Sequence, residues 1–325
     1  MQRRDFLKKT FFTSTALTVG VISKESISSV FENQLNNPGC IPKRKYGKTD
    51  VMLSIIGFGG IVVTDTEQTD ANRYVSEAYD RGVNYFDVAP SYGNAEIRLG
   101  PALEPYRKNV FLACKTGKRD YESAKIEFEN SLKILRTDYF DLYQLHAISN
   151  VEVDVKRAFA NDGVMKLLLE EKKKGRIRYL GFSAHSHAAA LEAMNIYDFD
   201  SILLPVNFAG YLKGNFSPAV IEKTKEKGMA ILAIKMLARQ NADKNDPVRK
   251  LYPKCWYQPI TDIEEAKLAM SFTMSQPVTA AVPPGDIRSF RLAADLADKI
   301  EPMNEEKLKK LMEISSELNP IFVNS

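Results

Sequence analysis

Four residues in the first half of the chain carry side chains that together can deliver a proton to an oxygen atom: Asp87, Tyr92, Lys115 and His146. A phenol has an ordinary pKa of about 10, and a neighbouring ammonium lowers that pKa because it stabilises the phenolate. Lys115 can supply the ammonium, the Asp87 carboxylate can hold it, and the His146 imidazole can hydrogen-bond a reacting oxygen. Such a set would assist carbonyl reduction, with the hydride supplied by a cofactor.

Each of the four also has an ordinary interpretation when it is taken alone. Asp87 could cap a helix, Tyr92 could belong to a turn, Lys115 could be a surface charge and His146 a buried, hydrogen-bonded histidine. Their spacing favours a shared role. Asp87, Lys115 and His146 each end a short apolar run, and Tyr92 follows Asp87 by five residues in a turn rich in Pro, Ser and Gly.

The elements that would position these residues are eight apolar runs that alternate with amphipathic helical patterns. The runs begin near Leu53, Val83, Val110, Tyr139, Ile177, Ile202, Met229 and Thr279. The helical patterns cover 70–81, 95–106, 123–135, 163–174, 187–197, 217–226, 262–274 and 289–300. Strict alternation implies parallel strands, since each crossover has to cover the sheet.

Eight such units predict an α/β fold of the (β/α)8 TIM-barrel type, preceded by a short β-hairpin over 43–51 with Gly47 at its turn. Residues 43–325 are expected to form this single domain. In such a barrel the carboxyl ends of the strands carry the site, so the four residues should converge there. The alternative architecture is an open doubly wound sheet, but no G-x-G-x-x-G follows a strand, so a dinucleotide would not be held in the Rossmann manner.

The segment from Phe86 to Glu96 resembles the Asp-Thr-Ala-x-x-Tyr-Gly-Asn-Ser-Glu signature of aldo-keto reductases. The segments 111–115 and 141–146 are similar to the lysine and histidine strands of that family, and the resemblance runs from about Tyr46 to Ile300. It implies an extended NADP(H) across the barrel mouth, a small carbonyl substrate, and Tyr92 as the general acid supported by Asp87, Lys115 and His146.

The same resemblance implies a set of cofactor contacts. Ser183 and Asn207 would bind the nicotinamide amide, and Lys235 would contact the pyrophosphate, while Ile234 stands where many relatives have an aromatic ring. Gly285, Arg288, Arg291 and Asp295 belong to the loop and helix that read the adenosine phosphate. Besides Ile234, this chain departs from the family pattern at three places: Ala184 replaces Asn, Asp286 replaces Ser or Thr, and Asp295 replaces Asn. The last two leave the choice between NADPH and NADH open.

Residues 1–30 are predicted to be an export leader. Arg3-Arg4 stands ahead of a short apolar run from Phe11 to Ile22, an order that resembles a twin-arginine signal, although Gln2 replaces the usual Ser or Thr. The run is short and contains Thr and Ser, so no transmembrane helix is expected. The implied partner is the twin-arginine export machinery and the implied location is the periplasm, or the cytoplasm if the leader is not used.

Composition excludes several other functions. The net charge is +4, and residues 1–30 carry five basic against two acidic side chains, so the rest of the chain is close to neutral. Nucleic acid is therefore not an expected partner. The three cysteines, Cys40, Cys114 and Cys255, lack metal-site spacing, and no metal is expected; a Cys40–Cys255 disulfide stays open.

The sequence thus predicts an NADPH-dependent oxidoreductase that reduces an aldehyde or ketone, or runs the reverse reaction. The alternative is a non-catalytic NADP(H)-binding redox sensor or subunit on the same fold, because fold alone does not fix function. A metal-dependent lyase is disfavoured, since the strand ends lack a set of metal ligands. Trp256 and Tyr257, in a long segment after the seventh apolar run, could either line the substrate pocket or pack in a core.

Overall fold

The computed structural model describes residues 40–324; the predicted leader lies outside this range. Within it, eight parallel strands form the central sheet: β3 (Phe58–Gly59), β4 (Tyr85–Asp87), β5 (Phe111–Thr116), β6 (Phe140–Ile148), β7 (Ile177–Ala184), β8 (Ser201–Pro205), β9 (Ala230–Ile234) and β12 (Ala280–Val282). Neighbours in the sheet follow chain order. A parallel bridge between Ile56 and Ala281 joins the two ends, so the predicted barrel is confirmed.

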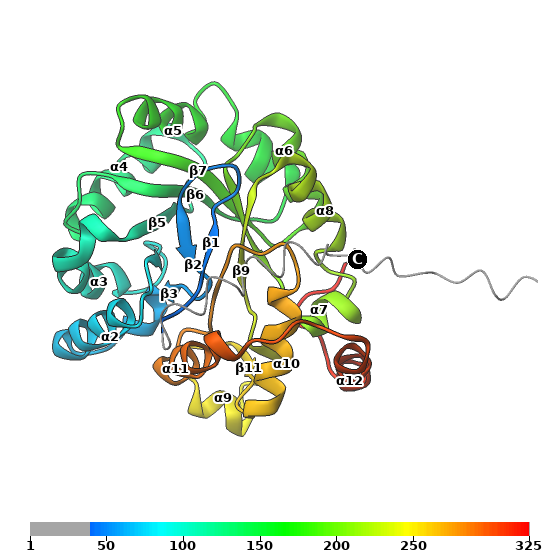
Figure 1. Ribbon diagram of the computed structural model, residues 1–325. Helices are drawn as coiled ribbons and strands as arrows, with labels where there is room; N and C mark the ends of the chain where they lie inside the picture. The colour runs from blue at the N-terminus through cyan, green and yellow to red at the C-terminus, as the bar shows by residue number, and fades with distance from the viewer. Residues whose placement is uncertain (1–39, 325) are drawn as a thin grey trace, which may run out of the picture.

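A helix follows each barrel strand and covers the outside of the sheet (Figure 1). In chain order these are α2 (Gln68–Asp80), α3 (Ala95–Leu103), α4 (Tyr121–Ile134), α5 (Val164–Lys173), α6 (His187–Ile196), α8 (Pro218–Lys227), α10 (Ile263–Met274) and α11 (Ile287–Leu296). Each overlaps one of the eight predicted helical segments. Local signals explain several boundaries: the Asp120 carboxylate accepts from the Ser123 amide at the start of α4, and Gly228 ends α8 in a left-handed conformation.

Other elements were not expected from the apolar pattern. The antiparallel pair β10 (Ala238–Asn241) and β11 (Tyr257–Pro259) flanks α9 (Pro247–Leu251) in the segment after β9. Two further helices are α7 (Phe208–Leu212) and α12 (Glu305–Ser316). Short 3-10 turns include η2 (Gly60–Val63), η3 (Glu104–Asn109) and η5 (Ala297–Lys299), and a π-helical turn, η4, spans Val151–Lys156.

The first barrel strand is shorter than the apolar run from Leu53 to Gly59 suggested. Its beginning is taken by β2 (Met52–Ser54), which pairs antiparallel with β1 (Lys43–Lys45). The hairpin itself is confirmed, with Gly47 at a positive φ of 56°. Leu53 is fully buried inside the barrel, which explains why this hairpin strand is as apolar as a barrel strand.

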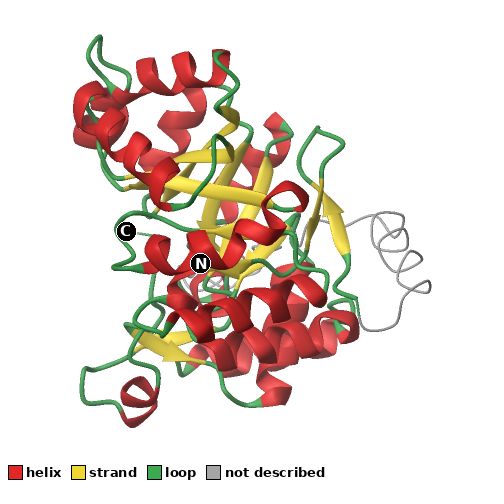
Figure 2. Cartoon of the chain, turned by 90° about the vertical axis from the view of Figure 1, so that its left-hand side faces the viewer, coloured by secondary structure: helices red, strands yellow, loops and turns green. Residues whose placement is uncertain are grey.

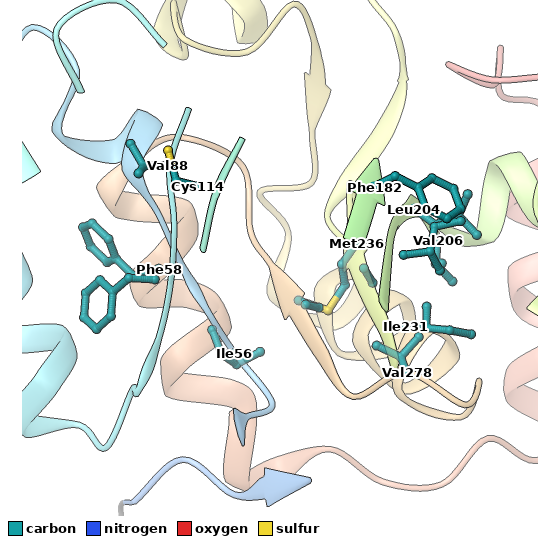
Figure 3. Close-up of a cluster of buried hydrophobic side chains, with 14 of the residues drawn as sticks. Ile56, Phe58, Val88, Cys114, Phe182, Leu204, Val206, Ile231, Met236 and Val278 are labelled. Atoms are coloured by element: carbon teal, nitrogen blue, oxygen red, sulfur yellow. The ribbon is translucent and has the colours of Figure 1, made fainter. Parts of the chain in front are cut away.

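Two apolar layers hold the barrel together. The larger one lies between the strands and the helices; Figure 3 shows part of it, including Phe58, Cys114 and Phe182. The smaller one fills the barrel interior, where the Tyr46 ring of the hairpin packs at a tilt against Phe111 and its hydroxyl donates to Ser201 Oγ at 2.7 Å. Figure 2 shows the strands enclosed by helices. The hairpin therefore closes one end of the barrel, and the reaction site is expected at the other end.

Candidate active site

Asp87, Lys115 and His146 lie at the carboxyl ends of the neighbouring strands β4, β5 and β6, and Tyr92 lies in the loop after β4. The Lys115 ammonium forms a buried ion pair with Asp87 and stands 5.0 Å from the centre of the Tyr92 ring. The Tyr92 and His146 rings meet edge to face with centres 5.6 Å apart. The barrel thus brings all four predicted residues into one cluster.

The charge state of Lys115 is fixed by Asp87. Burial of this fully enclosed side chain would lower its pKa, but the carboxylate beside it outweighs that effect and raises the pKa above the ordinary value. Lys115 Nζ also donates to the Val88 carbonyl at 3.2 Å. The ammonium is therefore charged and held in place at neutral pH.

The pKa of Tyr92 shifts in the direction opposite to the one expected from the sequence. Burial raises it, and the Lys115 ammonium lowers it only in part because the Asp87 carboxylate opposes that ammonium. Tyr92 consequently keeps its proton at neutral pH. A protonated phenol of this kind can release its proton when negative charge develops on a nearby oxygen.

His146 is neutral at neutral pH. Burial lowers its pKa to about 3, and the charges of Lys115, His185 and Arg119 act in the same direction. A neutral imidazole carries one N–H and one lone pair, so His146 can act as a hydrogen-bond partner without holding a charge.

Two residues that the sequence analysis missed hold the second oxygen of Asp87. The Tyr85 hydroxyl donates to Asp87 Oδ2 at 3.3 Å, and Gln144 Nε2 lies 3.5 Å from the same atom. Both side chains are fully buried. Each precedes a predicted site residue by two positions on its strand, so the alternation of side chains along a strand could have revealed them.

Ser183 and Asn207 end β7 and follow β8 at the same rim, and both are buried. Ser183 Oγ accepts a hydrogen bond from the Ala147 amide at 2.6 Å, which leaves the hydroxyl proton for another partner. Asn207 Oδ1 accepts from the Gly210 amide at 2.7 Å, which leaves the Nδ2 group as a donor. Each of these two residues therefore keeps hydrogen-bonding capacity for a further partner.

Lys235 directly follows β9 in a left-handed conformation, with φ of 68°. Its ammonium stands 4.4 Å from the Tyr257 ring centre and 5.3 Å from that of Trp256. Burial lowers its pKa to about 8. Trp256 is half-exposed and Tyr257 is buried, so the first borders the rim and the second packs beneath it.

The arginines predicted to bind the adenosine phosphate form ion pairs with carboxylates of the protein. Arg288 pairs with Asp286, and Arg291 pairs with Glu77 of α2 through two nitrogens. On the same helix, Asp295 pairs with Arg81. Gly285 packs so closely on η2 that an added Cβ would come within 2.2 Å of an Ile61 methyl group.

Two segments cross this end of the barrel. In the long segment between β10 and β11, Lys254 Nζ donates to the Val62 carbonyl at 2.8 Å, and Tyr252 lies under the Arg288 guanidinium at 4.0 Å. Near the C-terminus, Phe322 packs against His185 at 5.2 Å and stacks on Phe216 at 5.0 Å. Both segments therefore lie against loops that follow barrel strands.

Within residues 40–324, no group of three or more His, Cys, Asp or Glu side chains is arranged to hold a metal ion. Cys40, Cys114 and Cys255 are free thiols; Cys40 is exposed and Cys255 is buried beside the barrel mouth. A Cys40–Cys255 bridge is therefore not formed. The helices of the described chain are too short or too polar to cross a bilayer.

Comparison with known proteins agrees with this geometry. Residues 55–255 match the model of the aldo/keto reductase family. This chain belongs to that family. It is therefore an NAD(P)H-dependent oxidoreductase.

Individual relatives match different shares of the chain. The chain is similar to the uncharacterized oxidoreductase YqkF of Bacillus subtilis, with 26% identity over 83% of this chain and 95% of that protein. It is 30% identical to the L-galactose dehydrogenase of Arabidopsis thaliana over 44% of this chain and 48% of that protein. Its fold is similar to the holo form of aldo-keto reductase AKR11C1 from Bacillus halodurans, with a TM-score of 0.65, 24% identity, and 84% and 95% of the two chains covered.

The rim residues fit a nicotinamide dinucleotide at two of three places. Ser183 and Asn207 have hydrogen-bonding capacity for a carboxamide, and Lys235, whose side chain forms no ion pair with residues 40–324, suits a pyrophosphate. At the third place, an adenosine phosphate would have to compete with Glu77 and Asp286 for the two arginines.

Proposed function

We propose that this enzyme uses NADPH to reduce an aldehyde or ketone to an alcohol, or catalyses the reverse reaction, with Tyr92 as the general acid. The observation that carries the proposal is the convergence of a protonated phenol, a buried ammonium and a neutral imidazole at one end of the barrel. Bound NADPH supplies the hydride.

The residues of the chain divide the remaining work. As negative charge develops on the substrate oxygen, the Tyr92 phenol gives it a proton, and the Lys115 ammonium stabilises the resulting phenolate. Asp87 holds that ammonium, with Tyr85 and Gln144 on its other oxygen. His146 donates a hydrogen bond to the same substrate oxygen.

The proposal is tested with purified protein and a panel of aldehydes and ketones, by following NADPH oxidation. Turnover of at least one carbonyl compound is the expected result. Tight NADPH binding without turnover of any substrate, in either direction, would favour the redox-sensor alternative.

We also propose that the Arg291 guanidinium binds the adenosine phosphate once the phosphate displaces the Glu77 carboxylate. Arg291→Ala should then weaken NADPH binding about ten-fold or more, since a charge-assisted contact is lost, and leave NADH binding almost unchanged. Glu77→Gln should strengthen NADPH binding because it frees the guanidinium. Dissociation constants can be measured by quenching of the single tryptophan, Trp256, which borders Lys235. Equal effects of Arg291→Ala on both cofactors would refute the assignment.

A third proposal concerns residues 1–30: they direct the folded protein, with its cofactor bound, through the twin-arginine machinery to the periplasm. Replacing both Arg3 and Arg4 by Lys should retain the protein in the cytoplasm, because that pathway reads the arginine pair. Cell fractionation with an antibody against the C-terminal region measures this. A wild-type protein found only in the cytoplasm at full length would reject export.

A further inference from the structure

The two nitrogens of the His146 ring have different surroundings. Nδ1 lies 3.3 Å from the hydroxyl oxygen of Ser91, the residue immediately before Tyr92. Among residues 40–324, this is the hydrogen bond that the ring makes. Nε2 forms no hydrogen bond with residues 40–324, so it remains available to a ligand, and the ring meets that of Tyr92 edge to face.

The backbone around His146 is fixed on both sides. Arg119 Nη2 donates to the His146 carbonyl at 2.6 Å, and the next amide, that of Ala147, donates to Ser183 Oγ at 2.6 Å. Ala147 is held at a positive φ of 52°, which a residue with a Cβ rarely adopts. The backbone that carries the ring is therefore fixed by the fold, and the question left is which ring nitrogen carries the single proton.

The proton of a neutral imidazole goes to the nitrogen that its hydrogen-bond partners favour. If the Ser91 hydroxyl donates to Nδ1, the proton sits on Nε2 and that nitrogen can donate to a substrate. If Ser91 instead accepts from Nδ1, Nε2 presents a lone pair. A carbonyl oxygen only accepts hydrogen bonds, so a lone pair on Nε2 would repel it.

We propose that Ser91 is a positioning residue whose hydroxyl donates to Nδ1 of His146 and thereby keeps the ring proton on Nε2. The inference rests on the proposed function, because it assigns His146 the task of donating to the substrate oxygen. It also gives a reason for Ser91 to stand beside Tyr92: the loop that carries the acid also sets the tautomer of the second donor.

The test reads the tautomer directly by ¹⁵N NMR of the histidine rings. The chain has three histidines, His146, His185 and His187, so the spectrum is simple, and the His146 signals are those missing from His146→Gln. We expect Nδ1 of the wild type to be an unprotonated acceptor and Nε2 to be protonated. Ser91→Ala should give a mixture of tautomers, and Ser91→Thr, which keeps the hydroxyl, should restore the wild-type spectrum.

Carbonyl reduction provides the second readout. Ser91→Ala should lower kcat about three- to ten-fold, the loss expected from one partly exposed hydrogen bond, and Ser91→Thr should recover most of it. Ser91 is exposed, so the alanine variant should fold, which circular dichroism can check.

Two results would overturn the inference: a wild-type His146 protonated on Nδ1, or a Ser91→Ala variant with an unchanged tautomer. Failure of the proposed function is a separate result, seen as absence of turnover, and the NMR measurement still decides the role of Ser91.

Discussion

Tyr92→Phe should lower kcat for carbonyl reduction by about 100- to 10,000-fold, the range that a positioned proton donor contributes. The phenol is the protonated group at the mouth whose ammonium neighbour, Lys115, can stabilise the anion left after proton transfer. Phenylalanine keeps the ring that packs against His146 and removes only the hydroxyl. The measurement is single-turnover oxidation of bound NADPH, which separates chemistry from product release.

The matched control is cofactor affinity. NADPH should bind Tyr92→Phe as tightly as the wild type, because the proposed dinucleotide contacts come from other strands. If Tyr92→Phe turns over carbonyl compounds at a rate close to that of the wild type, another group supplies the proton and the assignment of Tyr92 is wrong.

Lys115→Met should cause the largest loss of stability among the variants considered. Lys115 is fully buried and Asp87 is 3% exposed, so the substitution leaves a buried carboxylate without its cation. Such a loss typically lowers the free energy of unfolding by about 3–5 kcal/mol. Urea denaturation followed by circular dichroism measures it.

The double variant Asp87→Asn with Lys115→Met separates stability from chemistry. It removes both charges, so it should regain most of the lost unfolding free energy. It should nevertheless remain nearly inactive, since the ammonium that stabilises the Tyr92 phenolate is gone. A double variant as unstable as Lys115→Met would show that packing, rather than the unpaired carboxylate, causes the loss. Recovery of activity together with stability would remove Lys115 from the proposed mechanism.

The order of the barrel strands and of the helices that cover them follows from the sequence by itself. The barrel strands are largely buried on both faces and read as short apolar runs, and the helices show apolar stripes that cover the sheet. Because parallel strands present their carboxyl ends at one rim, Asp87, Lys115 and His146 could be predicted as neighbours from their places at the ends of runs. The motif around Tyr92 added the proposed proton donor to this set.

The tertiary structure determined the electrostatic environment and the contact partners of each of those residues. A local pattern shows that Lys115 can stabilise a phenolate, but only the packed barrel shows that burial and Asp87 together outweigh it, so the pKa of Tyr92 rises. The pairing of Arg291 with Glu77 joins residues 214 positions apart, and no local rule connects them. The contact between Ser91 and His146 joins residues 55 positions apart, and no local rule connects these two either.

The sequence therefore determined which residues occupy the rim, because strand periodicity is a local property of the chain. The charge states, the ion-pair partners and the hydrogen bond at Nδ1 of His146 depend on distances between distant segments and on exclusion of water. Those quantities exist only once the barrel has closed.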